Sequence, residues 1–122
     1  MIGYVTVGTN DLKKAGAFYD KICGELGMGR FMENDRIIAR VGPGGGAGFG
    51  VALPYDGTPM AVGNGVLAAF RAKDKAQVDR VYKLALSLTG SCEGALGQRS
   101  EKFYAAYFRD PDGNKLNAFV MG

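Results

Sequence analysis

The sequence contains no histidine, so the commonest metal ligand and the commonest general base are both missing. A catalytic metal site built on three histidines, or on histidine and glutamate, is therefore excluded. Cysteine is scarce as well: Cys23 and Cys92 are the only two, and their separation fits neither a metal-ligand pair nor a CxxC redox motif. We interpret them as reduced, partly buried thiols.

Long apolar runs and clusters of basic residues are also missing. No apolar segment is long enough to cross a bilayer, and the residues after Met1 enter a strand-like pattern without the features of a signal peptide. The formal net charge is only +3, and the lysines and arginines are spread along the chain instead of forming the basic stripe of a nucleic-acid surface. We therefore expect a cytoplasmic protein that binds neither nucleic acid nor a membrane.

The composition is that of a single folded domain. The chain has 122 residues, of which 47% are hydrophobic and 22% are charged, and this is enough to bury one core but not two independent cores. We expect one domain over residues 1–122.

The strongest local signal lies near the end of the chain. Two aromatic-rich runs flank the segment Asp110-Pro111-Asp112-Gly113. Asp at the first turn position and Pro at the second favour a type I turn, and Gly at the fourth position releases the chain. The sequence therefore predicts a hairpin with strands over 103–109 and 115–120.

The first half of the chain reads as a strand, a helix and three short strands. Alternating side chains predict a strand over 2–9, and an apolar stripe predicts a helix that begins at Asn10 or Asp11 and ends near Leu26. Further strands are expected over 30–33, 37–41 and 49–53. The glycine-rich segment 42–50 is interpreted as a flexible connection between two strands, because its loose match to a dinucleotide-binding fingerprint has no helix after it.

The same order of elements returns further along the chain. A shift of 63 residues places Asp11 on Asp74 and Tyr19 on Tyr82. A second helix over 74–88 is then followed by strands near 94–98, 103–109 and 115–120. The chain is thus predicted to be an α+β protein with two β-α-β-β-β modules, 1–57 and 64–122. The helices are expected to pack on the first strand of each module, at Val5, Val7, Ala68 and Phe70.

These paired modules, the opening segment Val5–Leu12 followed by Phe18-Tyr19, and the closing segment Phe108–Leu116 together resemble the vicinal oxygen chelate superfamily. This superfamily includes glyoxalase I, bleomycin resistance proteins and extradiol dioxygenases. The resemblance implies an eight-stranded, cup-shaped sheet with the helices outside and a ligand or metal inside. It also implies a homodimer.

In the superfamily a metal is typically held by His, Gln or Glu side chains on the first and last strands of each half. The resemblance places these positions at Tyr4, Leu67 and Asn117, with the remaining one near Val51 or Leu53. A leucine offers no lone pair, and a neutral tyrosine or an asparagine amide is a weak ligand for Zn or Ni. We therefore expect no metal and no other cofactor, and we assign no catalytic residue.

The inward-facing positions predict a small-molecule site instead. They are mostly apolar, with a few hydroxyl and amide groups, as is usual for such sites: Tyr4, Thr6, Leu67, Ala69, Asn117 and Phe119. Arg71 shares a face with Leu67 and Ala69, and at the rim its guanidinium would bind a carboxylate or phosphate. The same residues also fit a filled core with Arg71 in solvent. Tyr104, Tyr107 and Arg109 fit a cup lining, a dimer contact or plain strand positions.

Two classes of function stay open. The favoured one is a metal-independent binding protein, similar to the bleomycin resistance branch, that holds an apolar or aromatic compound. The alternative is a glyoxalase-like lyase or isomerase, or a dioxygenase, with an atypical site. A metal-free isomerase that used Tyr4 as acid or base would lack an identified partner to activate the hydroxyl.

Overall fold

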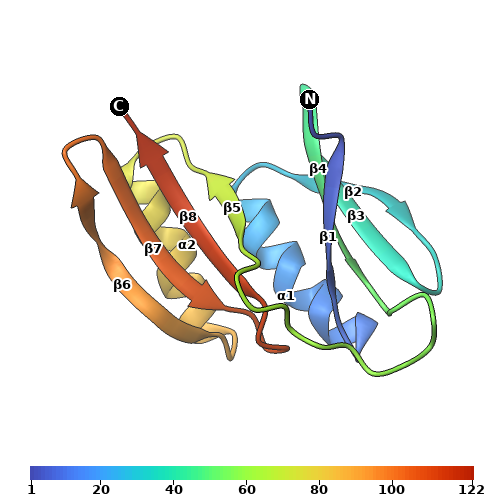
Figure 1. The fold of residues 1–122 in the computed structure, drawn as a ribbon. Helices are drawn as coiled ribbons and strands as arrows, with labels where there is room; N and C mark the ends of the chain where they lie inside the picture. Colours follow the sequence, from blue (N-terminus) through green and yellow to red (C-terminus); the bar gives the residue numbers. More distant parts are fainter. The chain divides into compact units, whose positions relative to one another are not determined.

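A computed structural model describes residues 1–122, and the chain divides into two compact units, Met1–Gly63 (unit 1) and Asn64–Gly122 (unit 2) (Figure 1). Each unit contains one helix and one four-stranded sheet, in the order β-α-β-β-β. The predicted α+β fold with two such modules is therefore confirmed. Its eight strands are divided between two sheets, one in each unit.

Unit 1 pairs its first and last strands in parallel. Its elements are β1 (Tyr4–Gly8), α1 (Leu12–Glu25), β2 (Gly29–Glu33), β3 (Ile37–Gly42) and β4 (Gly45–Ala52). The strand order is β1-β4-β3-β2, in which only the β1–β4 pair is parallel. Because β1 and β4 run in the same direction, their carboxyl ends lie at the same edge of the sheet.

Unit 2 repeats this plan. Its elements are β5 (Ala68–Arg71), α2 (Lys75–Ser87), β6 (Ser91–Ser100), β7 (Phe103–Arg109) and β8 (Lys115–Met121). The strand order is β5-β8-β7-β6, and β5 is parallel to β8. The last hairpin, predicted from its turn, is confirmed with β7 and β8 directly on either side of the Asp110 turn.

Both helices begin at an aspartate cap. The Asp11 side chain accepts a hydrogen bond from the backbone N–H of Lys14 at 3.1 Å, and Asp74 accepts one from that of Gln77 at 2.8 Å. Such a cap stabilises a helix by about 1 kcal/mol because it satisfies a free backbone donor. The two caps confirm the predicted repeat, in which Tyr4 begins β1 and Leu67 directly precedes β5.

The helices do not lie mainly on the first strands. In unit 1, α1 packs against β2, β3 and β4, where the Tyr19 ring lies 4.8 Å from the Phe49 ring, centroid to centroid. Val5 is 42% exposed, because β1 is an edge strand away from the centre of that contact. The expected packing of α1 on Val5 is therefore wrong. In unit 2, α2 packs against β6, β7 and β8, and Phe70 is buried as expected.

The glycine-rich segment is not a flexible connection. Most of it forms β4, which is hydrogen-bonded to β1 on one side and to β3 on the other. Gly46 has a φ of +87°, which favours glycine, and a Cβ at Gly50 would lie 3.3 Å from Cγ2 of Thr6. The prediction was wrong because pairing with two neighbouring strands offsets the entropy cost of ordering these glycines.

A charged side chain is buried between α1 and its sheet. Arg40 on β3 is 1% exposed, and its Nη2 donates to the carbonyl of Gly16 at 2.8 Å and to Oδ1 of Asp20 at 2.9 Å. Asp20 also accepts two hydrogen bonds from Arg30, at 2.8 and 2.7 Å. The hydrogen bond from Arg30, assisted by the one from Arg40, lowers the pKa of Asp20 to about 2. The Nε and Nη1 atoms of Arg40 have no partner.

Candidate ligand-binding site

The face of the unit 2 sheet opposite α2, here called the helix-free face, carries the predicted unit 2 site residues. Ala69 pairs with Asn117, and Arg71 pairs with Phe119. Side chains alternate along a strand, so these residues share one face with Leu67, while Leu116 and Ala118 point toward the helix. The register therefore places the predicted set Leu67, Ala69, Arg71, Asn117 and Phe119 on one side of the sheet.

Asn117 lies at the centre of this face. Its neighbours across the strands are Ala69 on β5 and Tyr107 on β7. It is only 3% exposed, and its Oδ1 atom has no hydrogen-bond partner. A buried carbonyl oxygen without a donor costs about 1–3 kcal/mol, so such a group is expected to serve a purpose other than stability.

Aromatic rings and cations surround Asn117. The Phe119 ring stacks on Phe103, with centroids 5.7 Å apart, and the Arg71 guanidinium lies 5.5 Å from the Phe119 centroid. The Tyr107 ring has the guanidinium of Arg99 at 5.5 Å and the ammonium of Lys115 at 5.7 Å. Flat rings with adjacent positive charge favour a planar, negatively charged molecule.

Sequence reasoning did not assign Phe103, Arg99 and Lys115 to the site and left Tyr107 ambiguous. Lys115 and Tyr107 could have been assigned from the turn. A hairpin closed at Asp110–Gly113 pairs Arg109 with Lys115 and Tyr107 with Asn117, which places all four side chains on one face. Tyr104 has the other parity: its hydroxyl donates to Oδ1 of Asp79 on α2 at 2.5 Å, and this hydrogen bond raises the pKa of Tyr104. Tyr104 is therefore not on the helix-free face.

In unit 1, the predicted site residues Tyr4 and Thr6 lie on the corresponding face of the sheet. Tyr4 pairs with Gly48 and Thr6 with Gly50, and both Tyr4 and Thr6 are exposed. Since Thr6 and Gly50 pair as Ala69 and Asn117 do, Gly50 is the unit 1 equivalent of Asn117. The sequence-based placement of this ligand position near Val51 or Leu53 is wrong. Val51 is fully buried and points to the helix side of the sheet, whereas Gly50 points to the opposite side.

The donors at these positions do not fit the metal that the superfamily resemblance implies. Unit 1 offers the phenol of Tyr4 and no side chain at Gly50, and unit 2 offers an alkyl group at Leu67 and an amide at Asn117. Zinc and similar ions take imidazole, carboxylate or thiolate groups, none of which is present in this set. The structure contains no cluster of three or more Cys, Asp or Glu side chains that could hold a metal ion.

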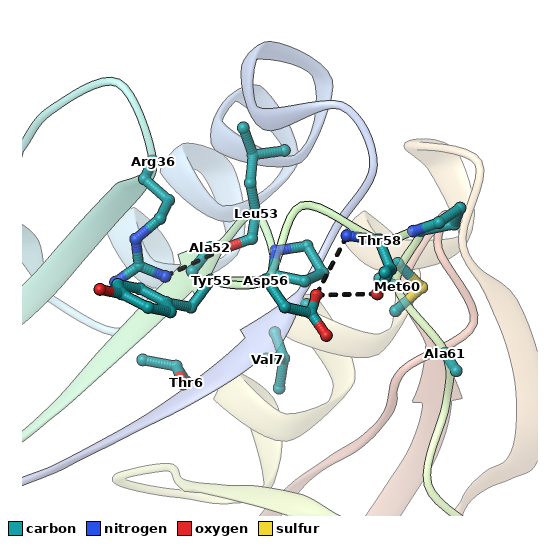
Figure 2. Close-up of a pocket in the computed structure, with 13 residues that line it drawn as sticks. Thr6, Val7, Arg36, Ala52, Leu53, Tyr55, Asp56, Thr58, Met60 and Ala61 are labelled. Carbon is teal, nitrogen blue, oxygen red and sulfur yellow. Dashed lines mark hydrogen bonds between the residues drawn. The ribbon is translucent and has the colours of Figure 1, made fainter.

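A concave feature lies within unit 1 (Figure 2). It is a pocket of about 440 Å³ at the carboxyl ends of β1 and β4, closed on one side by the segment 53–61. Arg36 Nη1 donates to the carbonyl of Leu53 at 3.1 Å, and the Arg36 guanidinium lies 5.4 Å from the Tyr55 ring centroid. Asp56 Oδ1 accepts hydrogen bonds from the backbone N–H of Thr58 at 3.0 Å and from its hydroxyl at 2.8 Å.

Of the predicted site residues, only Thr6 lines this pocket. The prolines and glycine of this segment, Pro54, Gly57 and Pro59, are typical of a loop, but they form no periodicity or motif that would reveal a pocket. The hydrogen bond from the backbone N–H of Thr58 and, to a smaller extent, the one from its hydroxyl lower the pKa of Asp56. Asp56 is therefore ionised at neutral pH.

Two β-α-β-β-β units with aspartate-capped helices define a glyoxalase-like α+β protein. The family model of the Glyoxalase/Bleomycin resistance protein/Dioxygenase superfamily matches residues 1–118. The chain belongs to this superfamily. Neither α1 nor α2 has the length and apolar character needed to span a membrane.

Solved structures show the same fold. A glyoxalase/bleomycin resistance protein from Albidiferax ferrireducens T118 is 38% identical, with a TM-score of 0.89, and the match covers 98% of this chain and 97% of that one. A lactoylglutathione lyase from Agrobacterium tumefaciens is 20% identical, with a TM-score of 0.71 and coverage of 98% and 92%. At that identity the second likeness concerns the fold alone. No match is found among curated proteins.

Proposed function

We propose that the protein binds a small aromatic molecule, without a metal, on the helix-free face of unit 2. The observation that carries this proposal is the buried Oδ1 atom of Asn117, which has no donor although it lies among aromatic rings. A ligand that displaces the side chains covering this oxygen and brings a hydroxyl or N–H group to it would satisfy the oxygen and recover the cost of burying it. Leu67, Ala69 and Phe119 would supply the apolar contact.

The charges on this face support a ligand with an acidic group. The Arg71 guanidinium makes no ion pair and is exposed beside Phe119, so its donors are accessible to a carboxylate or phosphate. The acidic side chain on β6, Glu93, pairs with Arg109 at 3.1 Å, and β6 forms the edge of the sheet opposite to β5, which carries Arg71. The favoured ligand is thus an aromatic acid that also carries a hydrogen-bond donor.

The chemistry of the donor set supports binding without a metal. Tyr4, Gly50, Leu67 and Asn117 offer at most weak oxygen ligands. Tyr4 and Thr6 line the equivalent face of unit 1, where Gly48 and Gly50 leave the sheet without side chains opposite them.

The test is a titration of the protein with para-hydroxybenzoate, in which binding is measured from the NMR shifts of the backbone amide signals. The hydroxyl of this compound matches Asn117 and its carboxylate matches Arg71. We expect benzoate, which lacks the hydroxyl, to bind the parent about fivefold more weakly, and we expect the two compounds to bind equally to Asn117→Leu.

Asn64→Ala is the matched control, because Asn64 is an exposed amide of unit 2 that lies outside its strands. It should keep the parent's preference for the hydroxylated probe. Dialysis against EDTA should leave every affinity unchanged. Equal binding of the two compounds by the parent, or binding that EDTA removes and zinc restores, would contradict the proposal.

We also propose that the protein is a homodimer in the cytoplasm. Large apolar side chains are exposed on the edge strands of unit 1, among them Tyr4, Val5, Phe31 and Met32. Edge strands with exposed apolar groups are normally covered by another chain. The two free thiols, Cys23 and Cys92, suit a reducing compartment. Sedimentation equilibrium at micromolar concentration tests the assembly, and a stable monomer would refute it.

A further inference from the structure

The unit 1 pocket carries a charge pattern that aromatic-acid binding on unit 2 does not use. Arg36 and Asp56 both line it, yet neither makes an ion pair with the other or with any other side chain (Figure 2). The Arg36 guanidinium donates only to the carbonyl of Leu53 and lies over the Tyr55 ring. Asp56 accepts only from Thr58. The pocket therefore contains one uncompensated positive charge and one uncompensated negative charge.

The segment that carries Asp56 is held in place by backbone hydrogen bonds. The N–H of Met60 donates to Oδ1 of Asn10 at 2.7 Å, and the N–H of Leu53 donates to the carbonyl of Arg36 at 2.8 Å. The segment 53–61 is thus attached at both ends to unit 1. A ligand that enters the pocket does not have to order this segment first, so less of its binding energy is lost.

The two charges select against singly charged ligands. An anion would be attracted by Arg36 but would lie in the same pocket as the Asp56 carboxylate, and a cation would meet the reverse arrangement. A molecule with one group of each sign satisfies both side chains. The remaining walls include the apolar side chains of Ala52, Pro54 and Met60, and a volume of about 440 Å³ suits a molecule the size of an amino acid.

We propose that this pocket binds a free α-amino acid with an apolar side chain. The carboxylate of the amino acid contacts Arg36, its ammonium contacts Asp56, and its side chain lies against Ala52, Pro54 and Met60. The site is separate in sequence and in chemistry from the helix-free face of unit 2, so it stands or fails independently of the function proposed above.

The experiment is an NMR titration of the full chain with L-leucine and two single-charge analogues. Isocaproate lacks the ammonium of leucine, and isoamylamine lacks its carboxylate. Leucine should shift the amide signals of residues 52–61, and each analogue should bind about fivefold more weakly, since both charged groups are solvent-exposed and each contact is modest.

Two variants assign the contacts. Arg36→Gln should weaken leucine binding about fivefold and leave isoamylamine binding unchanged or tighter. Asp56→Asn should weaken leucine binding similarly and leave isocaproate binding unchanged or tighter. Lys13→Gln and Glu101→Gln remove the same kinds of charge from exposed positions outside the pocket, and both should bind leucine as the parent does.

Three results would overturn the proposal. They are isocaproate binding as tightly as leucine, leucine-induced shifts confined to residues outside 52–61, and the absence of any shift up to the solubility limit of leucine. The first would define an anion site, the second would place the amino acid elsewhere, and the third would leave the pocket without this ligand.

Discussion

The two units share one backbone plan but differ in the strand next to the first one. On β4 of unit 1, the residues opposite Tyr4 and Thr6 are Gly48 and Gly50, so this face of the sheet has no side chains there. On β8 of unit 2, the position equivalent to Gly50 is Asn117, and the same face also carries Phe119. The repeat thus preserves the helix side of each sheet, whereas the opposite face is free to differ, because nothing in the fold requires it to pack on the helix.

The largest expected effect concerns the side that the two units share. Phe18 on α1 is 3% exposed, and Phe18→Ala should lower the free energy of unfolding by about 3–5 kcal/mol because it leaves a cavity under the helix. Val81→Ala, at the equivalent position of α2, should cost less, because fewer buried carbons are removed. Urea denaturation measures both. Val66→Ala, at an exposed position, is the control, and a loss there as large as that of Phe18→Ala would contradict this account of the core.

A smaller effect on the free energy of unfolding, of opposite sign, is expected on the helix-free face, where the two units differ. Asn117→Leu replaces a buried amide with an apolar side chain of similar volume and removes an oxygen that has no hydrogen-bond partner. We expect the free energy of unfolding to rise by about 1–2 kcal/mol while affinity for para-hydroxybenzoate falls. The measurement is urea denaturation beside the NMR titration. Destabilisation by Asn117→Leu would mean that this amide serves the fold and not a ligand.

These two variants also mark what the sequence could and could not predict. The repeat, the aspartate caps and the Asp110 turn rest on contacts between residues close in the chain, so their signals are readable locally. The parity of Asn117 follows from that turn. The strand character of 45–52 was not readable, because it depends on partners at β1 and β3 that are distant in sequence.

Burial of Arg40 was equally hidden. An arginine beside Ile38 and Ala39 in a strand normally indicates a solvent-facing position. Here it points under α1, where the carbonyl of Gly16 and the carboxylate of Asp20 receive it. The pocket beside Tyr55 escaped prediction for a related reason: its walls come from a loop whose path is fixed by single hydrogen bonds, and such bonds leave no periodic pattern.

The two units should also differ in how their stability depends on pH, because only unit 1 buries a cation, Arg40, beneath its helix. The pKa of Asp20 is lowered from 3.8 to about 2, so folding favours its ionised form. This contribution is fully present above pH 3.8 and is lost as the pH falls toward 2. Since the Asp20 side chain is 45% exposed, solvent screening reduces it to about 1 kcal/mol. The difference in stability between the parent and Asp20→Asn should therefore shrink over this range, and a difference that is constant with pH would contradict the assignment.

The smallest expected effect is that of metal removal, since neither unit offers a strong ligand set on its helix-free face. Dialysis against EDTA should leave the melting temperature unchanged, and the protein should fail to isomerise the hemithioacetal of methylglyoxal and glutathione. Stoichiometric Zn, Ni, Fe or Mn in the purified protein, measured by plasma mass spectrometry, would show that other side chains hold a metal.

The turn at Asp110 also decides which chemistry unit 2 presents. Asp110 is buried, and its carboxylate accepts hydrogen bonds from the backbone N–H groups of Asp112 at 3.0 Å and Asn114 at 2.9 Å, and from the Asn114 side chain at 2.9 Å. This closed network fixes the length of the loop. A loop one residue longer that kept the β7 register would exchange the two sides of β8 and bring Leu116 and Ala118 to the helix-free face, where Asn117 now lies. A few hydrogen bonds at the tip of the hairpin thus fix the register of β8 and determine which half of its side chains a ligand can contact.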